Sequence, residues 1–408
     1  MTDAERIGRQ NHPQKEIDMR DAVIVEAVRS PIGKRNGSLK GVHAVELSAQ
    51  ILNALAARSG IDVNLIDDVH WGNVISIGEQ SGNVGRMAVL GAGWPESIPG
   101  FTVDRQCGSS QQAISTAAAA LISGQADVVV AGGVEMMSNV PMQAANVEGT
   151  GELGGPAVTR YADELNRFPG FGGRFNQGAG AEKIAADYGL SRTQLDEYSV
   201  ESHERAAAAR DAGMFDAEIA AVTIDDSTFT ADEGIRPGST VDRLAGLKTP
   251  FLDDGVITAG NASQISDGAA ALLMTTSEKA ASLGLTPIAR VHTAVVTGDD
   301  PVKMLTGPIP ATALALKRSG LSIGDIDAFE VNEAFAPVPL AWQIETGAAS
   351  KRLNPLGGAI ALGHPLGASG ARLAVTLVHH LTHTGGRYGL QTMCEGGGTA
   401  NATIYEAL

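Results

Sequence analysis

The chain has 408 residues, about two to three domains by the usual ~150 residues per domain, and its 43% hydrophobic content is enough for a large core. The formal net charge of −16 argues against nucleic-acid or anionic-membrane partners, whose phosphates require a basic surface. Two cysteines exclude a disulfide scaffold, and no stretch approaches the ~18 apolar residues of a membrane span. We therefore predict a globular, cytoplasmic protein.

The N-terminal 18 residues are polar and show no periodicity, whereas Met19 opens an alternating, strand-like segment. We predict that residues 1–18 are a disordered extension or the product of an upstream start codon. A transit peptide is a poor interpretation of this segment, because it contains several acidic residues and transit peptides contain few.

Two parts of the chain repeat at an offset of 260 residues. Residues 57–73 and 317–333 share arginine, serine, glycine, isoleucine and aspartate at matching positions without a gap. At about the same offset, the strand-like residues 127–133 fall near 388–394. Coincidence between two α/β stretches is the alternative, but the ungapped match of unlike residues favours a duplication.

Each half alternates helix-forming and strand-like segments. In the first half, the alanine-rich residues 111–123 predict a helix, and the apolar run 128–131 that follows predicts a buried strand. This alternation is typical of folds in which helices cover a sheet. We therefore predict that each half is one layered α/β unit.

Residues 140–251 differ from both halves in composition and in their pattern of predicted elements. They contain glycine clusters at 149–155 and 170–173 and two helical runs, 181–188 and the strongly charged 195–212. We interpret this region as an inserted lid. The predicted boundaries are 19–139 together with 252–285 for the first half, 140–251 for the lid and 286–408 for the second half.

Cys107 lies in the string VDRQCGSSQQA, which opens the predicted helix at 111–123. A sulfur at a helix N-terminus is placed where the helix dipole favours the thiolate, so Cys107 is a candidate nucleophile. A buried structural cysteine, whose pKa would be raised, is the alternative interpretation.

A cysteine nucleophile needs a base within hydrogen-bond reach. Of the nine histidines, only His364 lies in a glycine-rich turn, where Gly363 and Pro365 flank it, and it is the candidate base. Asn332, in VNEAFAP, could orient a water or the imidazole, although an asparagine after a strand is otherwise an ordinary turn residue.

Cys394, in TMCEGGG, is a second thiol. Acyl transfer alone needs one nucleophile, but chemistry at a carbon–carbon bond beside a thioester also needs an acid or base at the α-carbon, and a thiol can fill that role. The glycines that follow leave backbone N–H groups free for an oxyanion hole. A disulfide between Cys107 and Cys394 is the alternative, improbable as a permanent bond in a reducing compartment but conceivable as a redox switch.

Five segments together resemble the signature blocks of the thiolases: VDRQCGSSQQA, TAGNASQISDGAA, VNEAFAP, NPLGGAIALGHPLGASG and TMCEGGG. The resemblance covers residues 19–408 and implies duplicated βαβαβαββ halves that form a five-layered α/β/α/β/α core. It also implies an inserted loop domain that holds coenzyme A, and a homodimer or homotetramer.

The resemblance also implies catalytic roles. Cys107 would attack the keto carbon of a 3-ketoacyl-CoA, with His364 lowering its pKa. Cys394 would protonate the leaving acetyl-CoA enolate, or remove an α-proton in the reverse condensation. The N–H groups of Cys107 and Gly396 would stabilise one oxyanion, and His364 with a water on Asn332 would polarise the other thioester oxygen. Free coenzyme A would then take the acyl group, so that the kinetics are ping-pong.

Coenzyme A and acyl-CoA are expected as substrates, with no permanently bound cofactor. Arg236 precedes Ser263 by 27 residues, the spacing of a ligand-contacting arginine and serine in thiolases. Arg243, Ala259 and Phe335 are weaker candidates for coenzyme A contacts. Without the family context, the arginines would be read as surface charge and Phe335 as core.

Nucleotide and metal sites are not predicted. The chain has no Walker A or G-x-G-x-x-G string. His379 and His383 have i,i+4 spacing, but no acidic ligand lies nearby, so we interpret them as a solvated helix face.

Two departures bear on the substrate, because many thiolases have asparagine at the position of Asp104 and methionine at that of Gln177. The strings around Cys107 and Cys394 resemble those of degradative thiolases, including enzymes for steroid side chains. The alternatives are a biosynthetic acetoacetyl-CoA-forming acetyltransferase, a ketoacyl-synthase-type enzyme, a non-catalytic lipid-binding protein and a papain-like hydrolase. Cys394 counts against the ketoacyl synthase, which lacks a second thiol.

Overall fold

The computed structural model describes residues 20–145 and 154–408, so the predicted extension 1–18 lies outside the described residues. The strands are β1 Val23–Arg29, β2 Gly33–Lys34, β3 Asp68–Gly72, β4 Phe101–Val103, β5 Val128–Met136, β6 Val222–Ile224, β7 Ser227–Phe229, β8 Ser266–Thr275, β9 Ala289–Gly298, β10 Ala328–Val331, β11 Tyr388–Glu395 and β12 Thr399–Ala407. The α-helices are α1 Ala44–Ser59, α2 Val84–Gly91, α3 Ser109–Ser123, α4 Gly155–Arg160, α5 Ala162–Arg167, α6 Gln177–Asp187, α7 Arg192–Asp211, α8 Val241–Ala245, α9 Ser277–Leu283, α10 Pro308–Ser319, α11 Pro337–Thr346, α12 Ala359–Leu362 and α13 Leu366–Thr384.

Ten of the described strands form one sheet in the order β10-β11-β12-β9-β1-β8-β5-β3-β4, with β2 paired to β8. The two halves of the sheet join where β1 pairs with β9, at Val23 with Arg290 and at Ile24 with Ala289. In each half the last strand, β8 or β12, runs antiparallel to both of its neighbours. The sheet therefore consists of two halves, called wings below, that are connected by the short pairing of β1 with β9.

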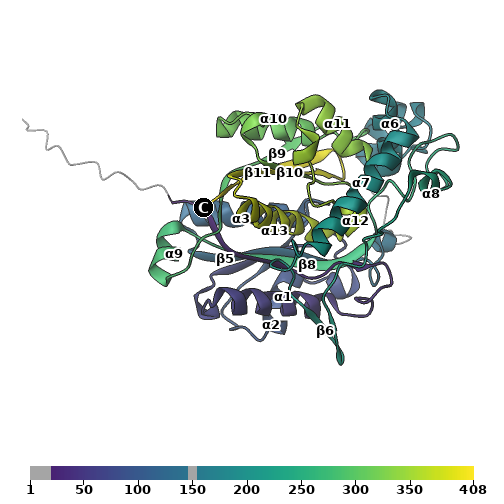
Figure 1. Cartoon of the computed structure of the whole chain (residues 1–408). Helices are drawn as coiled ribbons and strands as arrows, with labels where there is room; N and C mark the ends of the chain where they lie inside the picture. The colour runs from purple at the N-terminus through teal and green to yellow at the C-terminus, as the bar shows by residue number, and fades with distance from the viewer. Residues whose placement is uncertain (1–19, 146–153) are drawn as a thin grey trace, which may run out of the picture.

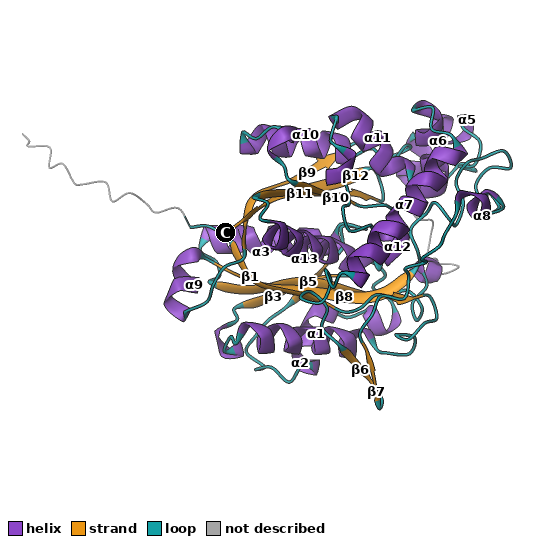
Figure 2. Ribbon diagram, viewed as in Figure 1, coloured by secondary structure: helices purple, strands orange, loops and turns teal. Residues whose placement is uncertain are grey.

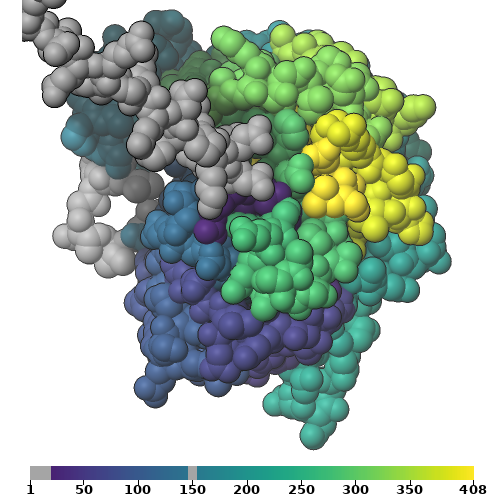
Figure 3. Space-filling model, turned by 90° about the vertical axis from the view of Figure 1, so that its left-hand side faces the viewer, coloured from purple at the N-terminus to yellow at the C-terminus, as the bar shows by residue number. Residues whose placement is uncertain are grey.

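The two wings enclose the helices α3 and α13, while α1 and α2 cover the outer face of one wing and α10 and α11 that of the other (Figures 1 and 2). This is the predicted five-layered α/β/α/β/α core. Strands β5 and β8 are buried along their whole length because helices cover both of their faces. On the face in Figure 3, the purple-to-blue part of the chain lies at the bottom, and the light-green and yellow parts lie at the top and right.

The 260-residue repeat is confirmed in three dimensions. Helices α1 and α10 both end at a left-handed glycine, Gly60 (φ 68°) and Gly320 (φ 74°), a conformation that glycine adopts without strain. A single 3-10 turn follows at residues 63–65 and again at 323–325. The second half is nevertheless incomplete. Its expected third strand is reduced to one bridge between Leu353 and Phe329, so the βαβαβαββ pattern is complete only in the first half.

The segment between β5 and β8 contains α4 to α8 and the hairpin β6–β7. The predicted helical runs 181–188 and 195–212 correspond to α6 and α7. The hairpin, however, packs on the α1 side of the sheet, where Val222 is buried in the core (Figure 1). The lid over residues 140–251 therefore stays a prediction, and its β6–β7 part packs against the first half.

The fully buried Arg29 of β1 ties this inserted segment to the sheet. Its guanidinium pairs with Glu218 at 2.5 Å and with Asp232 at 2.7 Å, and both carboxylates are themselves buried. These charges compensate one another in an interior where a lone charge would be very unfavourable. Among the described residues, no helix is both long and apolar enough to cross a membrane.

Candidate active site

Cys107 lies directly before α3, at the end of a tight turn. The preceding residue, Gln106, has a left-handed backbone (φ 48°), which is unusual for a residue with a side chain. Asp104 holds this turn by accepting the Gln106 N–H at 2.7 Å, and the Ser109 hydroxyl donates to the Gln106 carbonyl at 2.6 Å. The turn therefore presents the Cys107 thiol at the helix N-terminus, as predicted.

The pKa of Cys107 departs from the predicted direction. Burial, followed by the carboxylates of Glu395, Glu135 and Asp104, raises it to about 12. The expectation that the helix dipole and His364 lower this pKa was wrong, because the thiol is almost fully buried among acidic groups. Cys107 is therefore a neutral thiol in this structure.

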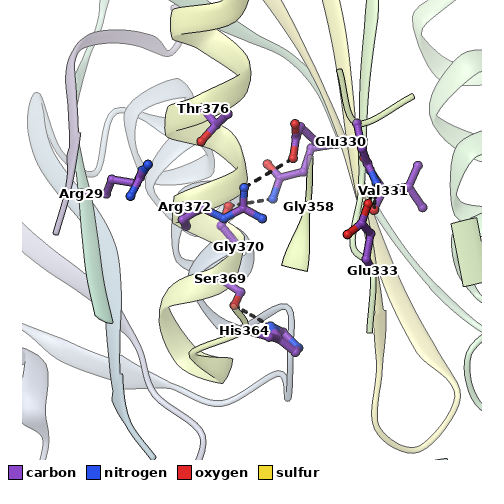
Figure 4. Close-up of polar contacts among 12 residues, drawn as sticks. Arg29, Glu330, Val331, Glu333, Gly358, His364, Ser369, Gly370, Arg372 and Thr376 are labelled. Atoms are coloured by element: carbon purple, nitrogen blue, oxygen red, sulfur yellow. Dashed lines mark hydrogen bonds and ion pairs between the residues drawn. The ribbon is translucent and has the colours of Figure 1, made fainter. Parts of the chain in front are cut away.

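His364 lies in the turn between α12 and α13, where Gly363 adopts a positive φ of 105° and lets the chain reverse. Its backbone N–H donates to the Gln264 carbonyl at 3.1 Å. Its Nδ1 lies 2.5 Å from the Ser369 hydroxyl (Figure 4). Burial, followed by the positive charge of Arg372, lowers the pKa of the imidazole to about 3. His364 is therefore a neutral base with a fixed ring.

Asn332 directly follows strand β10, and its amide Nδ2 lies 3.4 Å from His364 Nε2. Its Oδ1 is buried and has no hydrogen-bond partner among the described residues. An acceptor in this position fits a donor such as a water molecule. The predicted pair of His364 and Asn332 is thus brought together.

Cys394 lies on β11, fully buried, and burial followed by the nearby Cys107 raises its pKa well above the usual range. Both cysteines are free thiols. Gly396 follows in the turn between β11 and β12, and a Cβ placed on it would lie 2.7 Å from Oε1 of Gln106. The turn that contains Gly396 therefore lies next to the turn that contains Gln106 and Cys107. Within the described residues, the N–H groups of Gly396 and Cys107 donate to no backbone carbonyl, as an oxyanion hole requires.

The predicted catalytic groups are not all linked by direct hydrogen bonds among the described residues. No hydrogen bond between the Cys107 thiol and the His364 imidazole occurs among the described residues. Their elements are nevertheless in contact, because the Ser110 hydroxyl of α3 accepts the backbone N–H of Ala371 in α13 at 2.8 Å. Cys107 lies near Cys394, and His364 lies near Asn332.

Two of the predicted coenzyme A residues lie beside the histidine turn. The exposed Arg236 reaches Oε1 of Gln264 at 3.4 Å, and the Gln264 carbonyl in turn holds the His364 backbone. The neighbouring Ser263 donates its N–H to the Ala334 carbonyl at 2.9 Å. Gln264, which the sequence analysis did not single out, thus connects the predicted ligand-binding arginine to the predicted base.

The other three predicted coenzyme A residues lie around the same segment. Phe335 is half-buried and pairs by a single bridge with Ala262. Ala259 is exposed, and the adjoining Gly260 packs against α8, the short helix that carries the exposed Arg243. All five candidates are therefore attached to the stretch that leads into β8.

A buried network that the sequence analysis missed surrounds these groups. Glu333, next to Asn332, accepts hydrogen bonds from Tyr198 of α7 at 2.9 Å and from the Ile360 N–H of α12 at 3.0 Å. Arg372 of α13 faces Glu330 at 3.6 Å, and burial raises the pKa of that carboxyl to about 8 (Figure 4). The only signal in the sequence was that Glu330 and Glu333 flank Asn332.

One metal-related prediction needs correction. His379 is not on a solvated face, because it is half-buried and its Nε2 lies 2.9 Å from the Ala27 carbonyl, which only accepts. His383 is exposed, as predicted. Among residues 20–145 and 154–408, no group of three or more histidine, cysteine or acidic side chains could hold a metal ion.

Comparison with known proteins shows which family the chain belongs to. Residues 22–278 match the thiolase N-terminal domain and residues 285–407 the thiolase C-terminal domain. The chain is 50% identical over 391 residues to the steroid 3-ketoacyl-CoA thiolase FadA6 of Mycobacterium tuberculosis, covering 96% of this chain and 95% of the relative. It is 41% identical over 409 residues to the beta-ketoadipyl-CoA thiolase of Escherichia coli, covering 95% and 100% of the two chains. The crystal structure of the Bacillus anthracis acetyl-CoA acetyltransferase superposes with a TM-score of 0.86 at 38% identity, covering 96% of this chain and 99% of the other. The chain belongs to the thiolase family.

Proposed function

We propose that the protein cleaves a 3-ketoacyl-CoA with coenzyme A, giving acetyl-CoA and a shortened acyl-CoA, within a degradative β-oxidation sequence. The observation that carries this proposal is the pair of neighbouring free thiols, Cys107 and Cys394. The neutral His364 supports it, because its turn leads into α13, the helix that contacts the Cys107 helix α3. A hydrolase or a ketoacyl synthase needs one such thiol, whereas cleavage of a carbon–carbon bond with thiol transfer uses two.

The proposed first half-reaction uses both thiols. The Cys107 proton passes to Nε2 of His364, and the sulfur attacks the 3-keto carbon while the N–H groups of Cys107 and Gly396 stabilise the oxyanion. The bond between C2 and C3 then breaks. A water held by Asn332 stabilises the oxygen of the departing enolate. The enolate takes the Cys394 proton at C2 and leaves as acetyl-CoA. Cys107 now carries the acyl group and Cys394 is a thiolate.

The second half-reaction restores both thiols. The thiol of free coenzyme A gives its proton to the Cys394 thiolate, and its sulfur attacks the acyl carbon on Cys107. The bond between Cys107 and the acyl group breaks, and the Cys107 sulfur recovers its proton from the imidazolium of His364. The products leave in two separate steps, so the kinetics are ping-pong.

We propose that coenzyme A lies along the stretch 259–264, with Arg236 and Arg243 close to its phosphates and Phe335 lining the site. The exposure of both arginines supports this placement, as does the contact from Arg236 to Gln264. We further propose that the lid is formed by the α4 to α8 part of residues 140–251, without the β6–β7 hairpin.

The identity to a steroid 3-ketoacyl-CoA thiolase supports a bulky, degradative substrate for this chain. The biosynthetic alternative, formation of acetoacetyl-CoA, has the support of the superposed acetyltransferase at lower identity. We also propose a homodimer or homotetramer, because β4 ends the sheet with half-exposed residues and offers an edge for pairing. The cytoplasmic location stays a prediction.

The decisive assay follows the loss of the magnesium-enolate absorbance of a 3-ketoacyl-CoA on addition of coenzyme A. We expect faster turnover of a steroid side-chain 3-ketoacyl-CoA than of acetoacetyl-CoA, and the reverse ratio would support the biosynthetic alternative. Cys107→Ala should abolish turnover. Consumption of substrate without coenzyme A would indicate a hydrolase, and no turnover of either substrate would indicate a non-catalytic protein.

A matched pair of arginine variants tests the coenzyme A site. Arg236→Ala should raise KM for coenzyme A about tenfold, because charge-assisted contacts to phosphate are lost. Arg210→Ala is the control, since Arg210 is also an arginine with an exposed head group but pairs with its neighbour Asp211. Equal KM values for the two variants would contradict the proposed site.

A further inference from the structure

The His364 imidazole has a buried neighbour to which no role has been given so far. Ser369, in the first turns of α13, is 1% exposed, and its Oγ lies 2.5 Å from Nδ1 of His364. The same hydroxyl lies 2.8 Å from the Pro365 carbonyl oxygen. Figure 4 shows Ser369 on the side of α13 that faces the histidine.

The carbonyl decides which atom donates in each of these contacts. The Pro365 oxygen can only accept a hydrogen bond, so the single hydroxyl hydrogen of Ser369 points to it. The Ser369 oxygen is then left with lone pairs toward His364, and it accepts from an Nδ1–H group. The opposite arrangement would place two oxygen lone pairs against each other at 2.8 Å.

The other side of the ring agrees with this assignment. Asn332 directs its amide Nδ2, a donor, toward Nε2 of His364 at 3.4 Å. An unprotonated Nε2 fits this donor, whereas an Nε2–H group would oppose it. The backbone is fixed as well, because the His364 N–H is held by Gln264 and a Cβ on Gly363 would collide with Ser266. Two independent neighbours therefore select the same neutral form of the imidazole.

We propose that Ser369 is a positioning residue of the acyl transfer, which holds neutral His364 as the Nδ1–H tautomer and so leaves Nε2 free to accept the Cys107 proton. The inference rests on the proposed function for its catalytic meaning. When the S–H bond of Cys107 breaks and the Nε2–H bond forms, the Nδ1–H group stays bonded to Ser369. Ser369 neither gains nor loses a proton, so it acts only through His364.

The test compares two buried serines that both donate to the carbonyl four residues earlier in a helix. Ser369→Ala removes the acceptor of Nδ1–H together with a bond of 2.8 Å to the Pro365 carbonyl. Ser48→Ala on α1 removes a similar bond of 2.7 Å to the Ala44 carbonyl, and Ser48 has no hydrogen bond to a histidine among the described residues. We expect Ser369→Ala to lower the rate constant for acylation of Cys107 by about 10- to 100-fold, with KM changed less than about twofold. Ser48→Ala should change neither constant.

A spectroscopic measurement keeps the inference independent of turnover. In protein labelled with ¹⁵N-histidine, with His364 assigned by the loss of its signals in His364→Asn, we expect a protonated Nδ1 and an unprotonated Nε2. Ser369→Ala should shift both signals toward a mixture of tautomers, and Ser369→Thr, which restores a hydroxyl, should reverse the shift and part of the rate loss.

Two results would overturn the inference: an Nε2–H tautomer in the wild-type protein, or Ser369→Ala with an unchanged tautomer and rate constant. If Ser369→Thr fails to fold, the Ser369→Ala spectrum still decides. Absence of wild-type turnover would refute the proposed function instead, and the tautomer measurement would stand without it.

Discussion

Glu333→Gln is the substitution whose effect can be worked out most fully from the structure. The Glu333 carboxylate is 1% exposed and accepts four hydrogen bonds. Its Oε1 accepts from the Tyr198 hydroxyl at 2.9 Å and from the Asn354 amide at 3.0 Å. Its Oε2 accepts from the Ser202 hydroxyl at 2.8 Å and from the Ile360 N–H at 3.0 Å. Each oxygen thus has one partner that can rotate and one that cannot.

Glutamine keeps the shape of Glu333 but replaces one acceptor by an NH₂ donor. A hydroxyl can turn and accept from it, whereas the N–H of Ile360 or of Asn354 cannot. Asn354 cannot flip either, because its amide already bonds both backbone groups of Val331. One buried donor is therefore left unpaired, which costs about 1–3 kcal/mol, and the remaining bonds lose charge assistance. We expect a total loss of about 2–4 kcal/mol in the free energy of unfolding.

Urea unfolding followed by circular dichroism measures this loss, and thiolysis assays measure its effect on the site. We expect kcat to fall about tenfold, because the Ile360 bond helps to hold the turn that carries His364. Glu201→Gln is the control, since the Glu201 side chain is 52% exposed and pairs with the neighbouring Arg205 of the same helix. If Glu333→Gln unfolded like this control, the reasoning from fixed donors would be refuted.

Three further predictions concern buried charges. Glu395→Gln should lower the pH at which iodoacetamide alkylates Cys107, because Glu395 is the charged group that most raises the Cys107 pKa. The alkylation is measured in a Cys394→Ala background, and an upward shift of the alkylation pH would contradict the prediction. Arg29→Met should lower the free energy of unfolding by about 3–5 kcal/mol, since two buried carboxylates lose their partner, and a loss below about 1 kcal/mol in urea unfolding would refute it. The pKa of Glu330 is raised to about 8, so above pH about 4.3 the folded state binds more protons than the unfolded state, and this group lowers stability as the pH rises toward 8. Glu330→Gln should therefore flatten the decline of the urea unfolding midpoint with pH. A slope equal to or steeper than that of the wild type would contradict this.

Local sequence patterns were sufficient for much of the fold. The 260-residue repeat predicted the two related halves, and the alanine-rich run at 111–123 predicted the helix that became α3. The sequence did not indicate that the second half lacks its third strand. Its loss is a matter of pairing, because Leu353 is buried like a strand residue but makes only one bridge, to Phe329.

The motifs identified the reactive side chains but not their surroundings. Cys107 was placed correctly at a helix N-terminus, yet the direction of its pKa shift depends first on burial. It depends next on Glu395 and Glu135, which approach from β11 and β5. Ser369 stood inside a recognised motif and still carried no local signal. Such contacts between distant segments leave no periodicity in the sequence, so only the folded chain reveals them.

The central position of β8 affects how the protein folds as it leaves the ribosome. This strand lies between β1 and β5, yet it is synthesised well over 100 residues after β5, once the whole inserted segment has been made. Until residue 275 emerges, the nascent first half must keep two apolar strands with unpaired edges. Such edges invite wrong pairing and aggregation, and long-range pairing is slow. The emerging chain should therefore depend on chaperones until β8 is inserted, and the second half can join at β9 only after that step.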